Sequence, residues 1–331
     1  MIDIHTIASS PKIIPIPTQM SLANRWDHLL ARVGVRRGEH RVEPGLYAVG
    51  NPTPESPVFV SANYTLSFDA LRSVLQGIDG YILVLDTKGI NVWCAAGKGT
   101  FGTDELVLRV MATRLKEVVS HRNLILPQLG APGVAAHEVK KRSGFWVEYG
   151  PVRAADLPEY LKTHAATAEM RKVQFTLKDR MVLIPVDVVQ SFLPMLAAAI
   201  VLYFLSGWTS SLAAIAAVLA GNALFPILLP WIPTHNFSTK GFLVGLVVAL
   251  PFALSVLIRH PDWNWWRQAG QALEYLLAMP AVTAFVALNF TGSTTFTSRS
   301  GVRREIFAYI PAMAWIFGIG VLFAVVFAFV H

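Results

Sequence analysis

The sequence is poor in cysteine and, over its second half, in charge. Cys94 is the single cysteine among 331 residues, which excludes an intrachain disulfide and a cluster of cysteine ligands for iron and sulfur. Basic residues are nowhere interleaved with aromatic residues as in a nucleic-acid groove, so no nucleic-acid partner is expected. An apolar core is missing from residues 1–20, where three prolines stand, and this argues against a cleavable signal peptide.

Charge divides the chain near Arg180. Residues 1–180 hold 22 of the 28 Lys and Arg and 17 of the 21 Asp and Glu, whereas residues 181–331 hold six and four. The first part has the length of one globular domain. The sequence therefore predicts a soluble domain over residues 1–180 and a transmembrane domain over residues 181–331.

The second part contains five apolar stretches, each about 20 residues long and so able to cross a bilayer. They cover residues 186–205, 212–232, 241–258, 269–290 and 306–330. Each stretch has one end on the same side of the membrane as the first domain. Lys and Arg are more frequent near these ends, which carry Arg171, Lys172, Lys178, Arg180, Lys240, Arg299, Arg303 and Arg304. The other side has only Arg259 and Arg267. This asymmetry predicts a multi-pass protein of the cytoplasmic membrane with its N-terminal domain inside and His331 outside.

Two polar residues within the apolar stretches, Asn222 and Glu274, have two interpretations. They line a transport path, or they tie helices together or sit near an interface. No inverted repeat is evident, so the sequence offers little support for a secondary transporter.

The first domain alternates between apolar strands and amphipathic helices. Strands are predicted at residues 58–62, 81–85, 124–127 and 145–148, and helices at 22–33, 68–76, 104–120 and 135–142. This order predicts a Rossmann-like α/β domain with a parallel sheet. Ligands of such sheets bind beyond the carboxyl ends of the strands, so the candidate loops are residues 62–67, 87–103, 128–134 and 150–153.

The loop after the second predicted strand carries the cysteine, in Asn91-Val92-Trp93-Cys94-Ala95-Ala96-Gly97-Lys98-Gly99-Thr100. Gly97–Gly102 matches the dinucleotide fingerprint G-x-G-x-x-G, but eleven residues separate it from the strand end at Leu85. Val92 stands where a P-loop requires its first glycine. Cys94 is otherwise a buried structural cysteine, or a metal-ligating thiolate on a short helix of small residues that packs against a flat ligand.

The stretch Asn91–Gly99 resembles the cap-helix motif of the HgcA family, the corrinoid proteins of microbial mercury methylation. Gln128–Val134 and Gly150–Arg153 resemble the same family, as does an α/β domain followed by five spans. The soluble domain is also similar, more distantly, to the corrinoid domain of the corrinoid iron–sulfur protein of acetyl-CoA metabolism, which lacks this cysteine motif.

The resemblance implies a corrinoid-dependent methyltransferase that transfers a methyl group from cobalt to Hg(II), with the Cys94 thiolate as lower axial cobalt ligand. It also implies an electron donor of the ferredoxin-like HgcB type, and a methyl donor of the methyltetrahydrofolate type or its methyltransferase. A helix N-terminus favours an anionic group such as a thiolate at Cys94, and Ala95, Ala96 and Gly97 leave room for a corrin face. The expected cofactor-binding residues are Ser61, Asn63, Thr65, Asn91, Val92, Trp93, Cys94, Ala95, Ala96, Gly97, Lys98, Gly99, Gln128, Gly130, Ala131, Pro132, Gly133, Gly150 and Arg153.

Several of these expectations have a plain structural alternative. Trp93 covers the corrin edge or fills the core, and Lys98 pairs with the cofactor tail or is a solvated surface charge. The turn Gly130–Gly133 is expected to admit the nucleotide loop of the cofactor. A competing signal, Asp3-Ile4-His5-Thr6-Ile7-Ala8, approaches the D-x-H-x-x-G of other corrinoid proteins but ends in alanine and follows no strand. Two rival functions remain: a corrinoid-binding carrier or transporter, and an NAD-linked membrane oxidoreductase.

Overall fold

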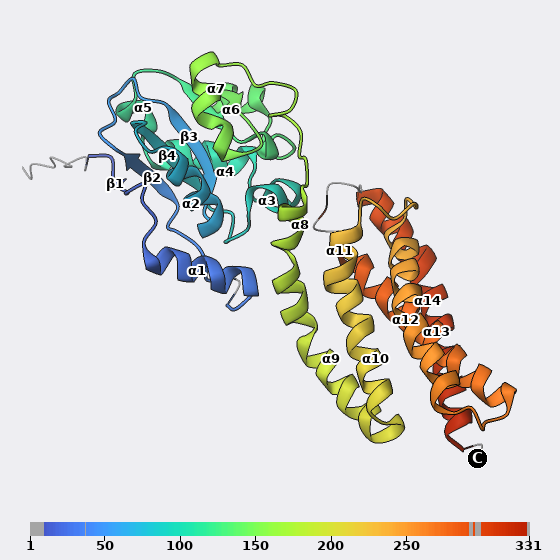
Figure 1. Ribbon diagram of the computed structural model, residues 1–331. Helices are drawn as coiled ribbons and strands as arrows, with labels where there is room; N and C mark the ends of the chain where they lie inside the picture. The colour runs from blue at the N-terminus through green and yellow to red at the C-terminus, as the bar shows by residue number, and fades with distance from the viewer. Residues whose placement is uncertain (1–9, 37, 291–293, 295–298, 330–331) are drawn as a thin grey trace, which may run out of the picture. The chain divides into compact units, whose positions relative to one another are not determined.

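The computed structural model describes residues 10–36, 38–290, 294 and 299–329, and these divide into two compact units between residues 173 and 174. Residues 32–34 group with the second unit. Figure 1 shows the elements of both. The two units are described separately as the N-terminal and the C-terminal unit.

The N-terminal unit is built on a six-stranded sheet in the order β1-β2-β4-β3-β5-β6. The strands are β1 (Ile13–Pro15), β2 (Gly45–Val49), β3 (Val58–Ala62), β4 (Gly80–Leu85), β5 (Asn123–Leu126) and β6 (Trp146–Tyr149). The last four run parallel, as the sequence predicts. β2 pairs antiparallel with β4, however, and β1 pairs parallel with β2, so the predicted α/β domain with a parallel sheet is confirmed with an antiparallel pairing at this edge.

Helices cover both faces of the sheet. They are α1 (Leu22–Val33), α2 (Thr65–Val74), α3 (Val92–Lys98), α4 (Thr103–Ala112), α5 (Leu115–Val118), α6 (Ala136–Ser143) and α7 (Leu157–Thr163), with 3-10 turns η1 (Gln128–Gly130) and η2 (Ala154–Asp156). Alternate residues of the strands divide the core in two. Leu83 of β4 packs with α3, α4 and α6, whereas Ile82 packs with α2 and α7. The result is a three-layer α/β domain.

The single helix predicted over residues 104–120 is two helices. Arg114 adopts a left-handed conformation with φ of 51° between α4 and α5. The Thr113 hydroxyl donates to the carbonyl of Arg109 at 2.8 Å, one turn back. The left-handed conformation ends α4, so the apolar stripe does not continue in one helix. Within α4, Met111 is exposed, although its spacing predicts a place on the apolar side.

The C-terminal unit is helical. Its elements are α8 (Leu177–Met181), α9 (Ile184–Ser206), α10 (Trp208–Leu219), the π-helical turn η3 (Ala220–Leu224), α11 (Phe225–Leu228), α12 (Phe237–Arg259), α13 (Trp265–Asn289) and α14 (Arg299–Phe329). Among the described residues, five helical spans are long and apolar enough to cross a membrane, which makes this a multi-pass membrane protein by composition. The π turn precedes Pro226, which cannot donate the next backbone hydrogen bond.

Glycine allows the helices of this unit to approach closely. A Cβ at Gly245 would lie 2.6 Å from Cα of Pro280, and one at Gly241 would lie 2.8 Å from Cα of Ala284. The hydroxyl of Thr283 reaches the carbonyl of Ala217 at 2.9 Å. Small residues and interhelical hydrogen bonds are the usual means of helix packing in lipid.

Candidate functional site

The candidate site lies at the carboxyl edge of the four parallel strands. Because β3, β4, β5 and β6 run in the same direction, the loops that follow them meet at one edge of the sheet. The connection from β4 to β5 carries α3, which contacts β3 and η1. The cysteine-bearing helix is therefore placed where parallel α/β sheets bind ligands.

Both ends of α3 are fixed by local interactions. The side-chain oxygen of Asn91 accepts a hydrogen bond from the backbone N–H of Cys94 at 2.9 Å, which makes Asn91 the N-cap. Gly99 ends the helix in the left-handed conformation, with φ of 83°, and its N–H bonds the carbonyls of Ala95 and Ala96. Asn91 and Gly99 thus define the length and position of α3.

The two sides of α3 differ in burial. Val92, Ala95 and Ala96 face the domain and are buried. Trp93 is 41% exposed, Gly97 is exposed and Cys94 is partly exposed, and the helical period places these three on the opposite side. This placement favours the ligand interpretation of Trp93 and Cys94 over core filling.

The small size of Ala95 and Ala96 serves packing within the domain. We expected these two alanines to leave room for a ligand, but both point into the core. Gly97 alone leaves a gap on the outer side, between the side chains of Trp93 and Cys94. The outer face of α3 is consequently a thiol and an indole on either side of a residue with no side chain.

The glycine turn after β5, Gly130–Gly133, is packed against Phe101 and Ala96 on its inner side. A Cβ at Gly130 would lie 2.5 Å from the ring of Phe101, and one at Gly133 would lie 2.1 Å from the backbone oxygen of Phe101 and 3.0 Å from Cα of Ala96. The inner side of this turn is therefore occupied by the domain itself, and the expected contact of Gly130–Gly133 with a cofactor tail stays a prediction. These glycines allow the turn to pack directly against α3 and against Phe101, which lies three residues after the end of α3.

Asn63 holds the loop that leads into α3. Its amide oxygen accepts from the N–H of Thr87 at 3.0 Å, the hydroxyl of Thr87 at 2.9 Å and the N–H of Gly89 at 3.0 Å, and its amide nitrogen donates to Asp86 at 3.2 Å. Asn63 is 1% exposed, and its amide is engaged within the domain. Its buried amide is a positioning group for the loop before Cys94, a role the sequence analysis did not assign to Asn63 or Thr87.

The other predicted site residues divide by exposure. Ser61 and Thr65 are buried, and the N–H of Thr65 donates to the carbonyl of His40. Gln128 accepts from Arg171 at 3.1 Å. Gly150 is buried and continues the ladder from β5 to β6 through its N–H. Lys98, Pro132 and Arg153 are exposed, and Ala131 is partly exposed. Asp3 and His5, the competing ligand signal, lie outside the described residues.

The structure does not place Gly97–Gly102 where a dinucleotide-binding fingerprint must lie. The fingerprint glycines should follow a strand and open a helix. Gly97 lies near the end of α3 and does not open a helix. A loop and most of α3 stand between β4 and Gly97. Gly102 approaches the carbonyl of Gly99, where a Cβ would lie 2.7 Å away, so its lack of a side chain has a packing reason.

A metal at this edge would find one protein donor. Within the described part of the chain, no three His, Cys, Asp or Glu side chains gather as a ligand cluster. Cys94 would supply one sulfur donor, and a group held there would have to bring most of its other ligands with it. A flat macrocycle that brings its own equatorial donors fits a lone thiol beside a residue without a side chain, whereas a bare Zn²⁺ does not.

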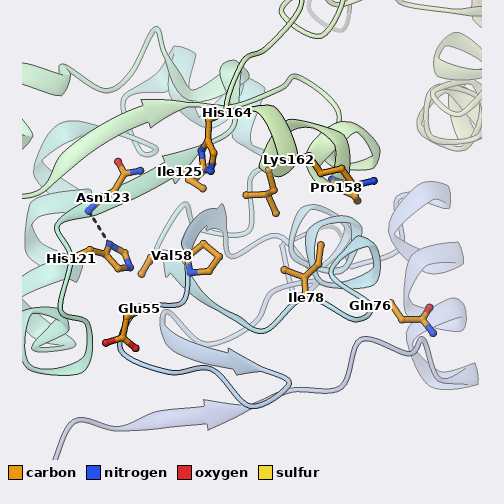
Figure 2. Close-up of a pocket in the computed structure, with 12 residues that line it drawn as sticks. Glu55, Val58, Gln76, Ile78, His121, Asn123, Ile125, Pro158, Lys162 and His164 are labelled. Atoms are coloured by element: carbon orange, nitrogen blue, oxygen red, sulfur yellow. Dashed lines mark hydrogen bonds between the residues drawn. The ribbon is translucent and has the colours of Figure 1, made fainter.

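A cavity of about 670 Å³ lies at the opposite edge of the sheet (Figure 2). It opens beside the first residues of β3 and β5, Val58 and Asn123, and none of the predicted site residues lines it. Two of its polar side chains are engaged: His121 accepts from the N–H of Asn123 at 3.1 Å, and the Asn123 amide donates to Glu148 at 2.6 Å. The cavity is separate from the site at α3.

Comparison with known proteins gives matches to the N-terminal unit. Residues 36–161 match the family model of CdhD, the CO dehydrogenase/acetyl-CoA synthase delta subunit. The chain is 36% identical over 129 residues to the acetyl-CoA decarbonylase/synthase complex subunit gamma of Methanopyrus kandleri, covering 38% of this chain and 27% of that protein. The subunit gamma of Archaeoglobus fulgidus is 33% identical over 124 residues, covering 37% and 26%.

A third relative is the corrinoid/iron-sulfur protein large subunit of Moorella thermoacetica, 26% identical over 129 residues, which cover 38% of this chain and 28% of that protein. The chain thus spans about a quarter of the length of the curated relatives it matches. The matched residues contain α3 and every loop of the candidate site. Over residues 36–161, therefore, the chain is similar to CdhD-type corrinoid-binding domains.

Proposed function

We propose that this chain is a corrinoid-dependent methyltransferase of the cytoplasmic membrane that methylates Hg(II), with Cys94 as the lower axial ligand of the corrinoid cobalt. One observation carries the proposal: α3 lies over the carboxyl edge of a CdhD-type domain and holds the lone cysteine of the chain on its outer side, next to Gly97. The resemblance of Asn91–Gly99 to the HgcA cap helix supports Hg(II) as the substrate.

Each residue near Cys94 has a separate task. Asn91 orients the first turn of α3 and so the direction of the thiol. Asn63 fixes the preceding loop through Thr87 and Gly89. Gly97 lets the backbone of α3 approach a flat ligand, and the exposed Trp93 indole excludes water from its edge. A bound corrinoid would supply the cobalt chemistry of methyl transfer, and Cys94 would hold it as a thiolate that donates electron density to the metal.

The proposal requires partners. The chain has one cysteine and cannot hold an iron–sulfur centre, so electrons must come from another protein, of the ferredoxin-like HgcB type. The methyl group comes from a donor of the methyltetrahydrofolate type or from its methyltransferase. The excess of Lys and Arg near one side of the spans supports a cytoplasmic N-terminal domain.

A second candidate function is a methyl carrier with a substrate other than mercury. It is favoured by the curated relatives, which are named as subunits of the acetyl-CoA decarbonylase/synthase complex. Both candidates expect a corrinoid on Cys94, and only the first expects methylmercury. Methylmercury assays on the loaded full-length chain with a reductant and a methyl donor separate them: corrinoid binding without methylmercury would favour the carrier.

Corrinoid binding is tested on full-length protein purified with the cofactor. We expect a cobalt–corrinoid absorption spectrum that changes in Cys94→Ala and Cys94→Ser, because alanine offers no donor and serine offers a neutral hydroxyl. Cys94→His should keep a nitrogen ligand, with a different spectrum. Ser73→Ala, on the exposed side of α2, is the matched control and should be unchanged. Bound nicotinamide without cobalt, or identical spectra in all variants, would contradict axial ligation by Cys94.

A further inference from the structure

Helix α1 is attached to the N-terminal unit by its polar side. Nε2 of His28 lies 2.8 Å from a carboxylate oxygen of Asp69, and Asp27 contacts Nδ1 of His40 at 2.7 Å. Ala31 is the one buried apolar residue of α1. The side of the helix that faces the domain therefore consists of polar groups around a small residue.

The opposite side of α1 is apolar and exposed. Leu22, Trp26 and Leu29 are 83%, 61% and 51% exposed. Their spacing of four and three residues places them in one row along the helix, about 180° from Ala31. An amphipathic helix on a soluble domain normally buries its apolar row, so α1 has the reverse arrangement. We define Leu22, Trp26 and Leu29 as the apolar row.

Positive charge lies beside the apolar row. Arg25 and Arg32 are seven residues apart, on one flank of the row, and both are exposed. The one acidic residue of α1, Asp27, is turned toward the domain and paired with His40. A helix with Trp and Leu on its outer side and Arg at the flank has the composition of helices that lie in the plane of a membrane surface.

We propose that α1 lies in the surface of the bilayer, with the apolar row among the upper acyl chains and Arg25 and Arg32 at anionic lipid phosphates. The membrane spans of the same chain hold this helix near a bilayer at all times, so a weak affinity for lipid is sufficient. The cationic flank favours an anionic lipid surface over a further apolar protein face. This inference is independent of the corrinoid and of mercury.

The test measures the surroundings of the apolar row in the full-length chain. A nitroxide spin label is placed at Trp26→Cys, and separately at Leu29→Cys, in a Cys94→Ala background, because Cys94 is the single native cysteine. The chain is held one per nanodisc of phosphatidylcholine and phosphatidylglycerol. Collision of the label with oxygen and with a water-soluble nickel chelate is measured by power saturation, with Ser73→Cys on the exposed side of α2 as the control position.

Lipid contact predicts a severalfold higher ratio of oxygen to nickel accessibility at positions 26 and 29 than at Ser73, because oxygen concentrates in acyl chains and the chelate is excluded. A ratio equal to that at Ser73 would place the row in water and overturn the proposal. Low accessibility to both reagents would mean that protein covers the row, and this also overturns it. Discs of phosphatidylcholine alone should lower the ratio if anionic phosphates hold Arg25 and Arg32.

Discussion

Buried polar groups and glycines have different structural roles in the two units. In the N-terminal unit the buried amide of Asn63 fixes a loop, and Gly133 lets a turn pack onto the helix that carries Cys94. In the C-terminal unit Gly245 brings two long helices together, and the buried hydroxyls of Ser210 and Tyr275 bond across helices at 3.0 Å. The first set positions a site, and the second set assembles a bundle.

The bundle offers less evidence for chemistry of its own. Glu274 is buried and approached by Gln271 of the same helix at 3.4 Å, and Nδ2 of Asn222 has no hydrogen-bond partner among the described residues. Under the proposed function, the reactive group and its supports belong to the N-terminal unit. Changes in the two units should therefore have separable effects.

The largest effect concerns membrane orientation. Reporter fusions at Gly292 and at His331, both outside the described residues, should give opposite all-or-none signals, because α14 separates them. The Gly292 fusion should report the cytoplasm. Equal signals at both positions would show that the number of spans is not five.

Gly133→Ala should destabilise the N-terminal unit by about 3 kcal/mol and displace α3, because the new Cβ would overlap the backbone of Phe101 and Ala96. Corrinoid content and the thermal unfolding of this unit report the change. Gly45→Ala is the matched control, since no described atom lies within 4 Å of a Cβ there. Normal corrinoid content in Gly133→Ala would mean that the position of α3 does not matter for binding.

Gly245→Ala should destabilise the bundle by about 2 kcal/mol, because its Cβ would overlap Pro280 and Thr283. Unfolding in bicelles measures this loss, and Gly318→Ala is the control, with no described atom within 4 Å of the added Cβ. Corrinoid content should stay unchanged in the folded fraction. A loss of corrinoid equal to that in Gly133→Ala would contradict the claim that the C-terminal unit does not affect corrinoid binding.

A smaller effect is expected from pH, through His40. Burial acts to lower its pKa, but the carbonyl of Val35 and the carboxylate of Asp27 outweigh burial, and the pKa is raised above 6.5. The charged form is thus favoured in the folded state, so its stabilisation is complete below pH 6.5 and is lost as pH rises through the raised pKa.

Thermal unfolding of the N-terminal unit should therefore show a loss of about 1.4 kcal/mol for each pH unit by which the His40 pKa is raised. The comparison is made between pH 6 and pH 8. His40→Gln should remove this dependence. A pH profile that is the same in both proteins would assign the dependence to another group.

Much of the fold follows from the sequence where local signals agree. The alternation of β3, α2 and β4, and the start of α3 after Asn91, need only apolar runs and a capping residue. Edge strand β1 was missed because three residues ending at Pro15 resemble a loop, and only pairing with β2 makes them a strand. The break at Arg114 was missed because the apolar spacing continues past it.

The candidate site was predicted in position but not in detail. Cys94 and Trp93 lie on the outer face of α3, as expected for ligand contacts. The sequence could not separate Gly97 from Ala95 and Ala96, because all three are small and only the direction of the helix distinguishes them. The role of Asn63 in holding the loop was not predicted, because its hydrogen-bond partners, Thr87 and Gly89, are 24 and 26 residues away in the chain.

The central claim is that the Cys94 thiol is the cobalt ligand used in methyl transfer. The most direct test is methylmercury formation by Cys94→Ala at protein levels matched to the wild type, in full-length chain with its reductant and methyl donor. The account predicts complete loss with the fold retained, because the N-cap bond from Asn91 is to the backbone N–H and alanine is a good helix former. Methylation near the wild-type rate would contradict it.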